Sequence, residues 1–214
     1  MTIPIWMKTK DTVHNMKKIF ILIFCIFSLQ IIGQKEPTST TFFKPYPENF
    51  TVKHALEVES LVPMFFTGGY HFAVGYRFKR FRIRASVING GTYNAERAGV
   101  NNSSNSFKRY YTTSPGLFLG YNIWRNLELY TYLEFHTFAI TQRSTQVVKN
   151  LKSIDSGLGI SYQIFVGRYF YIQPGLHFYV RAKNSLAFLG ETYHIPTKDF
   201  SVVLRLGVRL WRKY

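Results

Sequence analysis

Residues 200–211 read FSVVLRLGVRLW and carry the clearest structural signal in the chain. Side chains alternate between the two faces of a β-strand, and here apolar and polar residues alternate with the same period of two. A helix would scatter the two kinds of residue around its surface, so the pattern predicts a strand. Val203 is the only interruption between an apolar face of Phe200, Val202, Leu204, Leu206, Val208 and Leu210 and a second face of Ser201, Arg205, Gly207, Arg209 and Trp211.

The same alternation recurs upstream in seven further segments, which predicts an all-β chain of about eight strands. Pro174 lies on the apolar side of one of these segments and cannot donate a ladder hydrogen bond, so we expect a bulge or an interrupted pairing there. The seven segments are residues 56–62, 70–78, 81–87, 117–123, 127–135, 158–166 and 169–181.

The connections between these segments alternate between short and long. Tight turns fall at residues 79–80, 124–126 and 167–168, whereas residues 90–109, 141–152 and 183–198 form long connections. The first connection on the long side, residues 63–68, is short. Short turns on one side, long loops on the other and an even strand number are typical of a closed, up-and-down, antiparallel transmembrane β-barrel.

Over Lys53 to Tyr214 the sequence resembles the small eight-stranded outer-membrane barrels of the OmpA and OmpX type. The aromatic Tyr214 is part of this resemblance, and Arg212, in the apolar phase just before it, departs from the usual terminal pattern. The resemblance implies a narrow barrel, integral to the bacterial outer membrane and filled by side chains, with no wide aqueous pore. We expect a monomer.

The N-terminal region has the features of a targeting segment. Lys17 and Lys18 precede an apolar run from Ile19 to Leu29, which is too short to span a bilayer comfortably. We therefore predict a cleaved signal peptide at residues 16–33, preceded by an upstream extension at 1–15. Residues 34–51 are expected to form an irregular periplasmic arm, and residues 52–214 the barrel. Removal of the signal removes Cys25, the single cysteine of the chain, so thiol catalysis and thiolate metal sites are excluded.

Charged residues fall on the polar face of the predicted strands, five acidic against six basic. Inside a narrow barrel such charges must be paired, because an unpaired buried charge is costly. We therefore expect an interior ion-pair network of structural importance. Its members are Glu57, Glu59, Glu128, Glu134 and Asp155 with Arg77, Arg82, Arg84, Arg181, Arg205 and Arg209.

Much of the remaining positive charge falls in the long connections. The formal net charge of the chain is +16, and basic loops at the outer surface would meet the phosphates of outer-membrane lipid and lipopolysaccharide. A generally solvated charged rim is the alternative. Nucleic acid is not expected as a partner, because the bases alternate with apolar residues and a secretory signal directs the chain away from it. The candidate phosphate ligands are Arg97, Lys108, Arg109, Arg143, Lys149 and Lys152.

Three histidines form the only candidate for catalysis. His71, His136 and His177 lie on the polar face of three strands, with Glu134 nearby. A histidine beside a carboxylate can act as a general base or bind a metal, so a lipid A-modifying hydrolase or acyltransferase is one alternative. We favour hydrogen-bonded filling, with no catalytic residues, metal or cofactor.

The sequence therefore predicts an outer-membrane barrel with a structural or surface-interaction role through basic extracellular loops, without naming its extracellular partner. A narrow channel is a second alternative. A soluble lipocalin-like barrel is a third, because alternation alone does not tell the inside of a barrel from the outside.

Overall fold

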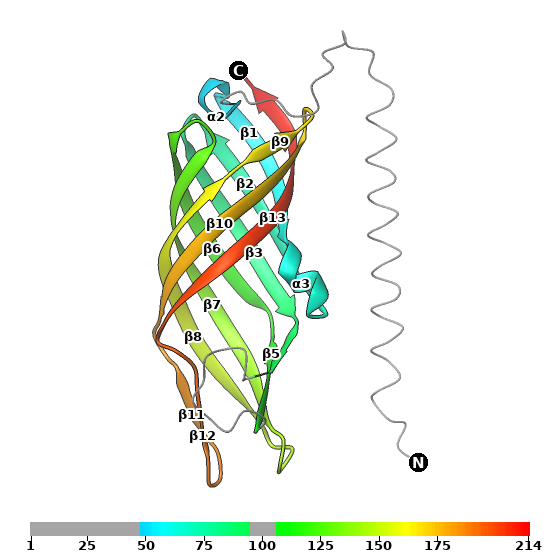
Figure 1. The fold of residues 1–214 in the computed structure, drawn as a ribbon, viewed down its shortest axis with the longest axis vertical. Coiled ribbons are helices and arrows are strands. Elements are labelled where there is room, and N and C mark those ends of the chain that lie inside the picture. The colour runs from blue at the N-terminus through cyan, green and yellow to red at the C-terminus, as the bar shows by residue number, and fades with distance from the viewer. Residues whose placement is uncertain (1–47, 95–105) are drawn as a thin grey trace, which may run out of the picture. The chain divides into compact units, whose positions relative to one another are not determined.

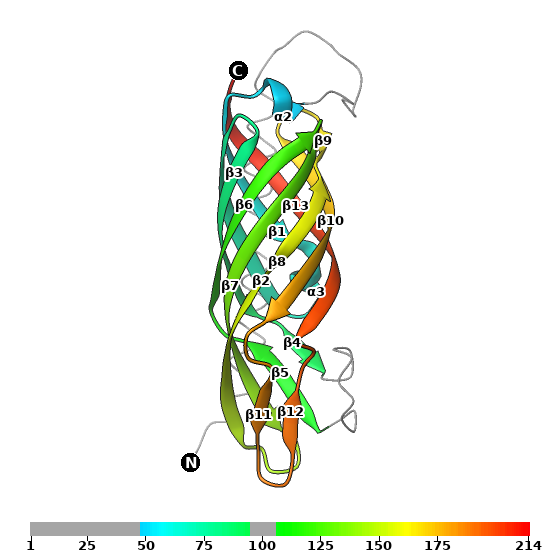
Figure 2. The same cartoon turned by 90° about the vertical axis from the view of Figure 1, so that its left-hand side faces the viewer.

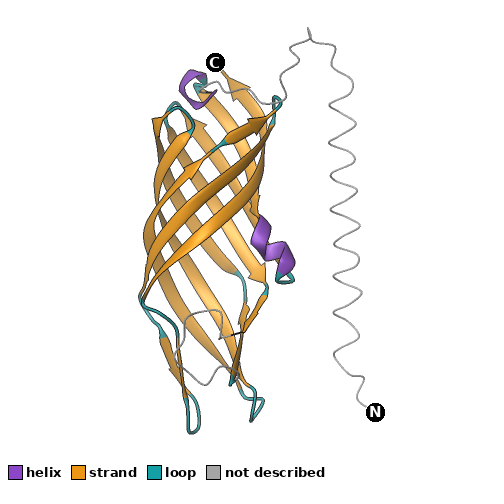
Figure 3. Cartoon of the chain, in the orientation of Figure 1, coloured by secondary structure: helices purple, strands orange, loops and turns teal. Residues whose placement is uncertain are grey.

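The computed structural model describes residues 48–94 and 106–214. Most of these residues are in strands (Figure 3), and the few helical residues lie in two short helices. Neither helix is long and apolar enough to cross a membrane. The elements are α2 (Glu48–Thr51), β1 (His54–Leu61), α3 (Val62–Phe66), β2 (Gly69–Phe78), β3 (Phe81–Gly90), β4 (Thr92–Asn94), β5 (Phe107–Tyr111), β6 (Ser114–Trp124), β7 (Leu127–Gln142), β8 (Val148–Tyr162), β9 (Ile164–Val166), β10 (Phe170–Arg181), β11 (Ser185–Ala187), β12 (Thr192–His194) and β13 (Lys198–Lys213).

The strands form a closed antiparallel barrel (Figures 1 and 2). Each strand pairs with its neighbour along the chain in the order β1, β2, β3, β6, β7, β8, β10 and β13, and β13 pairs back onto β1. Every backbone group of the wall can thus find a ladder partner without leaving an open edge. The predicted fold, a closed up-and-down barrel of eight strands, is confirmed.

The two ends of the barrel differ in their connections. At one end, which we call the turn end, tight turns follow β2, β6 and β9. At the other, the hairpin end, the strands continue beyond the barrel wall. Lys79 and Arg125 adopt positive φ values of 54° and 45°, as tight hairpin turns require of a central residue.

The long connections contain more regular structure than expected. We predicted polar loops at residues 141–152 and 183–198, but β7 runs to Gln142, β8 begins at Val148, and β11 pairs with β12. In the first long connection, β4 pairs with β5, and β5 continues the ladder along β7. Residues 95–105, at the tip of this connection, lie outside the described residues.

Two register features explain departures from strict alternation. Opposite Leu56 and Glu57, strand β13 supplies Trp211 and Arg209, so Leu210 is an extra residue in a bulge. Because a bulge reverses the phase of the residues after it, Trp211 is 49% exposed on the outside. The expectation that it shares a face with Arg209 was wrong.

The same phase reversal resolves the anomaly at Arg212. This residue pairs with Ala55, which is fully buried on the inner face. Arg212 is therefore not presented to the apolar exterior.

At Pro174, the pairing of β10 with β13 is continuous, whereas the pairing of β10 on its other side stops between β8 and β9. The interruption predicted at this proline is confirmed, without a bulge.

The inside and outside of the barrel are the reverse of those of a soluble protein. The largest fully buried side chains are headed by arginines, whereas Phe72, Leu119 and Leu206 are about half exposed on the outer face. Glycines on the inner face make room for neighbouring aromatic rings: a Cβ at Gly159 would collide with Tyr130, and one at Gly207 with Tyr171. A lipocalin-like barrel with an apolar ligand cavity is therefore excluded by the placement of these residues.

Candidate functional site

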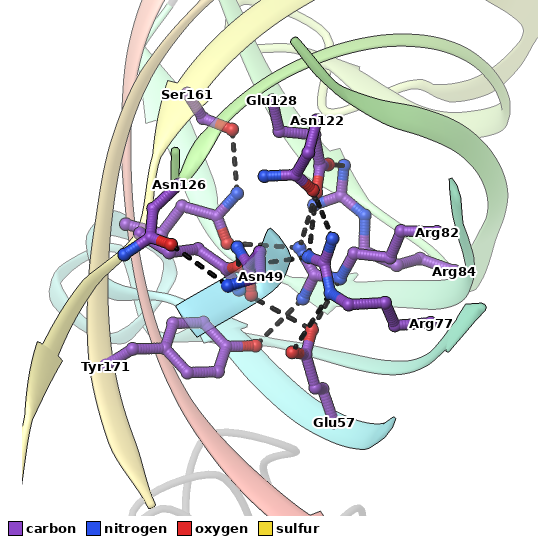
Figure 4. Close-up of polar contacts among 12 residues, drawn as sticks. Asn49, Glu57, Arg77, Arg82, Arg84, Asn122, Asn126, Glu128, Ser161 and Tyr171 are labelled. Atoms are coloured by element: carbon purple, nitrogen blue, oxygen red, sulfur yellow. Dashed lines mark hydrogen bonds and ion pairs between the residues drawn. The ribbon is translucent and has the colours of Figure 1, made fainter. Parts of the chain in front are cut away.

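The turn-end half of the interior is filled by a network of three glutamates and five arginines. Figure 4 shows part of it, with Glu57, Glu128, Arg77, Arg82 and Arg84 labelled. The glutamates come from β1 and β7, and the arginines from β2, β3 and β13, which alternation directs inward. All eight side chains are buried. The members are Glu57, Glu59, Glu128, Arg77, Arg82, Arg84, Arg205 and Arg209.

Arg82 lies at the centre of this network. Its Nε is 2.6 Å from Glu57 Oε2, its Nη2 is 2.6 Å from Glu59 Oε2, and it also donates to the Tyr171 hydroxyl at 2.9 Å. Glu59 in turn accepts from Arg84 Nη1 at 2.9 Å. The planar guanidinium presents donors in several directions at once, which lets one side chain bridge several acceptors.

Glu57 and Glu128 complete the network on either side. Arg209 Nε is 2.8 Å from Glu57 Oε1, and Arg84 Nη2 is 2.9 Å from Glu128 Oε1. Arg205 Nε lies 3.3 Å from Glu59 Oε1. Since these charges have left water, their mutual pairing must offset a large desolvation cost.

Helix α2 closes the turn end of the barrel. Asn49 is fully buried, donates to Gln163 Oε1 at 2.5 Å and accepts from Arg209 Nη2 at 2.5 Å. Its backbone N–H donates to Asn126 Oδ1 at 3.2 Å. The final residues of the arm predicted to be irregular are thus helical and packed into the barrel; residues 34–47 lie outside the described residues. Sequence pattern contained no signal for Asn49, because it precedes the first strand.

An aromatic layer lies above the network, towards the hairpin end. Phe118, Tyr130 and Tyr132 form a buried cluster, and the Arg84 guanidinium lies over both Phe118 and Tyr130 at 4.9 and 4.8 Å from the ring centroids. Cation–π contacts of this kind stabilise a guanidinium that has been removed from water. These rings fill the lumen at this level of the barrel.

The three histidines have structural partners. His71 Nδ1 accepts from the backbone N–H of Leu61 at 3.1 Å, and His177 Nε2 lies 2.9 Å from Arg205 Nη2. Because a guanidinium can only donate, His177 must accept. His136 Nε2 lies 3.4 Å from Glu134 Oε2.

The three histidines and Glu134, which the catalytic alternative would need, share one charge neighbourhood. Glu134 interacts electrostatically with His136, His177 and His71. Among the described residues, no group of three or more His, Cys, Asp and Glu side chains is arranged to hold a metal ion.

A separate ion pair lies nearer the hairpin end. Arg181 donates to both oxygens of Asp155, with its Nε 3.1 Å from each and its Nη2 2.7 Å from Oδ2. The predicted network therefore divides into two groups, with Arg181 and Asp155 apart from the remaining arginines. All of the predicted interior charges except Glu134, which is half-buried, lie in the buried class.

Arg109, one of the predicted phosphate ligands, is buried and not at the surface. It was expected to meet lipid phosphate, but it is 9% exposed and its guanidinium lies 5.2 Å from the centroid of Phe138. The reason is that β5 continues the ladder, which returns Arg109 to the inner face. It adds one more base to the interior. Burial raises the pKa of the neighbouring Tyr193 phenol, while Arg109 opposes the shift.

An apolar cluster closes the hairpin end. Its side chains come from β5, β7, β8 and the β11–β12 hairpin, which folds across them. Lys149 joins β8 to this hairpin, because its Nζ donates to the Ala187 carbonyl at 2.7 Å. The cluster consists of Phe107, Phe138, Ile140, Leu151, Phe188, Tyr193 and Ile195.

The other predicted phosphate ligands differ in position. Lys108, Arg143, Lys149 and Lys152 are exposed at the hairpin end. Arg97 lies outside the described residues. Lys108 on β5 and Lys152 on β8 occupy the outer phase of their strands.

Together the fold and its interior define a closed, eight-stranded antiparallel barrel with a charged, filled interior and an apolar exterior. No family model matches the chain, and no curated protein matches it. Two solved structures are similar. The N-terminal β-barrel domain of Pseudomonas aeruginosa OprF is 13% identical, with a TM-score of 0.38 over 73% of this chain and 97% of that one. Neisserial surface protein A (NspA) is 12% identical, with a TM-score of 0.40 over 73% and 95%.

Proposed function

We propose that this chain is an integral barrel of the bacterial outer membrane, with a filled interior and a structural or surface-interaction role through its hairpin end. The observation that carries the proposal is the reversal of inside and outside. Arg82 of β3 is buried in the lumen while its neighbours on the same strand, Phe81 and Ile83, are 60% and 52% exposed on the outer face. Only a hydrocarbon environment makes this arrangement favourable.

The size of the apolar band supports the membrane assignment. On β7 the outer face is apolar from Leu127 to Phe135 except for Thr131, and becomes polar or small from Thr137 onward. On β8 the corresponding band runs from Ile164 of the adjoining β9 back to Ile154, interrupted by Ser156, and Lys152 follows it. Tilted strands need about 9–11 residues to cross the hydrocarbon core.

Lipid phosphates are the proposed contacts of the hairpin end. Lys152 stands just beyond the apolar band, opposite Thr137 of β7, and Lys108 stands further along the ladder, opposite Thr141. Headgroup phosphates of the outer leaflet would contact this region. Arg143 and Lys149 lie near the β7–β8 tip. We expect a variant with Lys108→Gln and Lys152→Gln to retain less lipopolysaccharide on purification than the wild type. Equal or greater retention by the variant would contradict this contact.

The membrane proposal is tested by electrophoresis of the outer-membrane fraction. Closed membrane barrels commonly keep their fold in SDS until heated, so unheated and boiled samples are expected to migrate differently. Soluble periplasmic protein without a mobility shift would refute the proposal. Barrel assembly in vesicles of outer-membrane lipid, followed by the same comparison, provides a control that is independent of cellular export.

A lipid A-modifying activity is the second candidate, favoured only by the electrostatic proximity of Glu134 to the three histidines. If it existed, His136→Gln would change the lipid A profile of cells that express the chain. Identical lipid A profiles in cells with and without the protein would remove this candidate.

A further inference from the structure

An apolar groove runs along the outer wall near the turn end. It has a volume of about 580 Å³ and crosses strands β2, β3, β6, β7 and β8. Its lining is almost wholly apolar and includes Phe78, Phe81, Leu119, Tyr121 and Leu158. It lies within the band that the proposed function assigns to lipid.

Cations stand at the foot of this groove. Lys79 and Arg80 form the turn between Phe78 and Phe81, two of the groove residues, and both are exposed. The backbone N–H of Asn122 donates to the Arg80 carbonyl at 2.8 Å, which joins this turn to β6. Arg125 is exposed in the next turn, between β6 and β7.

Aromatic rings position these three cations. Lys79 Nζ lies 5.3 Å from the centroid of Phe78, the Arg80 guanidinium 4.2 Å from that of Phe50, and the Arg125 guanidinium 4.7 Å from that of Trp124. Such contacts restrict flexible side chains without neutralising them.

The charge at the turn end is biased towards positive, although Glu48 of α2 also lies at this end. The acidic side chains of the adjacent strands, Glu57, Glu59 and Glu128, point into the lumen and are buried. Further bases of the same end within the described residues are Lys53, Arg168, Arg212 and Lys213.

We infer that this groove and the cations at its foot form a binding site for one anionic phospholipid of the inner leaflet. The inference rests on the proposed membrane function. An acyl chain would occupy the groove, and the phosphate would lie among Lys79, Arg80 and Arg125. Charge complementarity selects an anionic over a zwitterionic headgroup, and the apolar lining selects a lipid over a free phosphate.

Lipid retention tests the site. The protein is reconstituted in vesicles of equal parts phosphatidylcholine and phosphatidylglycerol, extracted in mild detergent, and examined by native mass spectrometry. We expect the wild type to retain phosphatidylglycerol preferentially. The combined variant Lys79→Gln, Arg80→Gln, Arg125→Gln should lower this retention about tenfold or more. The groove-filling variant Leu158→Trp should lower it as well.

Two matched variants control for general effects. Lys183→Gln with Lys198→Gln removes exposed charges at the hairpin end, and Leu176→Trp adds the same bulk to the apolar exterior outside the groove. Both should retain phosphatidylglycerol like the wild type. Each protein is first shown to have the heat-dependent mobility shift, so that misfolded variants are set aside.

The outcomes separate this site from the proposed function. Equal retention of the two lipids by the wild type, or no change in either test variant, overturns the lipid site while leaving the membrane barrel intact. Failure of the wild type to insert and to show the mobility shift overturns the proposed function itself.

Discussion

Arg82 illustrates how single side chains hold this molecule together. It contacts Glu57 and Glu59 of β1 and Tyr171 of β10, so one residue of β3 links distant strands through the lumen. Glu59 likewise bridges several side chains, because it pairs with Arg82, Arg84 and Arg205. In an interior without water, each such carboxylate compensates several guanidinium charges, and its loss leaves them buried without a counter-charge.

We therefore expect Glu59→Gln to lower the free energy of unfolding by about 3 kcal/mol or more. Urea unfolding of the protein in lipid vesicles, followed by tryptophan fluorescence, measures this difference. Lys183→Gln, at an exposed position, is the control and should change stability by less than about 0.5 kcal/mol. A similarly small effect of Glu59→Gln would show that the network contributes little.

Among the secondary-structure elements, those outside the barrel wall close its ends. Helix α2 inserts Asn49 at the turn end, and the β11–β12 hairpin covers the apolar cluster at the hairpin end. Figure 1 shows these two elements at opposite ends of the barrel wall. The two elements are held by different interactions. Helix α2 is held by hydrogen bonds to buried amides and an arginine, whereas the hairpin is held by apolar contact.

At the turn end, Asn49→Ala is expected to lower the free energy of unfolding by about 1–3 kcal/mol, because Gln163 and Arg209 lose a buried partner. The heat-dependent mobility shift should persist, since the barrel wall is unchanged. Asn150→Ala, exposed on β8, serves as the matched asparagine control. Equal stability of both variants would mean that α2 is not anchored through Asn49.

At the hairpin end, the double variant Phe188→Ala, Tyr193→Ala should release the β11–β12 hairpin from the apolar cluster. Both rings are buried and pack against Phe107. Proteinase added outside vesicles is expected to cleave residues 185–194 faster in this variant than in the wild type. Leu189→Ala is the control, because Leu189 is 88% exposed at the tip. Unchanged cleavage of the double variant would argue against a hairpin held by this cluster.

For the whole molecule, the filled lumen bears on the alternative of a narrow channel. A path along the axis meets Asn49, the glutamate–arginine network, the Phe118 cluster and finally the apolar cluster at the hairpin end. We expect packing at each of these levels, among the described residues, to leave no continuous water column. Closure is therefore a property of several layers and not of one constriction.

We accordingly expect no stable conductance when the wild-type protein is inserted in a planar bilayer. Insertion is verified independently by protection of the barrel from proteinase. Reproducible stepwise conductance from verified insertions would favour the channel alternative and would require the layers to rearrange. The Asn49→Ala variant should also show no stable conductance, because the loss of one closing residue leaves the other layers in place.

The sequence by itself determined the strands, their order and which charged residues share one face. Period-two alternation is local, so 200–211 and its counterparts specify strands and faces without knowledge of distant pairing. The tight turns likewise predicted antiparallel neighbours. Most of the interior charges, from Glu57 to Arg209, were identified in this way.

Only the tertiary structure decided which face is the inside, because the alternation is the same whichever face points into the barrel. Closure of the sheet through the β1–β13 pair sets the direction in which it curves. Register between paired strands also lies beyond a single strand's pattern: it produced the bulge at Leu210, turned Trp211 outward and placed Arg109 in the interior. Strand pairing also brings distant segments together. It places Asn49 at the turn end, and it places the turns that carry Lys79 and Arg125 at the foot of the same groove. These features depend on contacts between strands, whereas the sequence pattern reports on each strand alone.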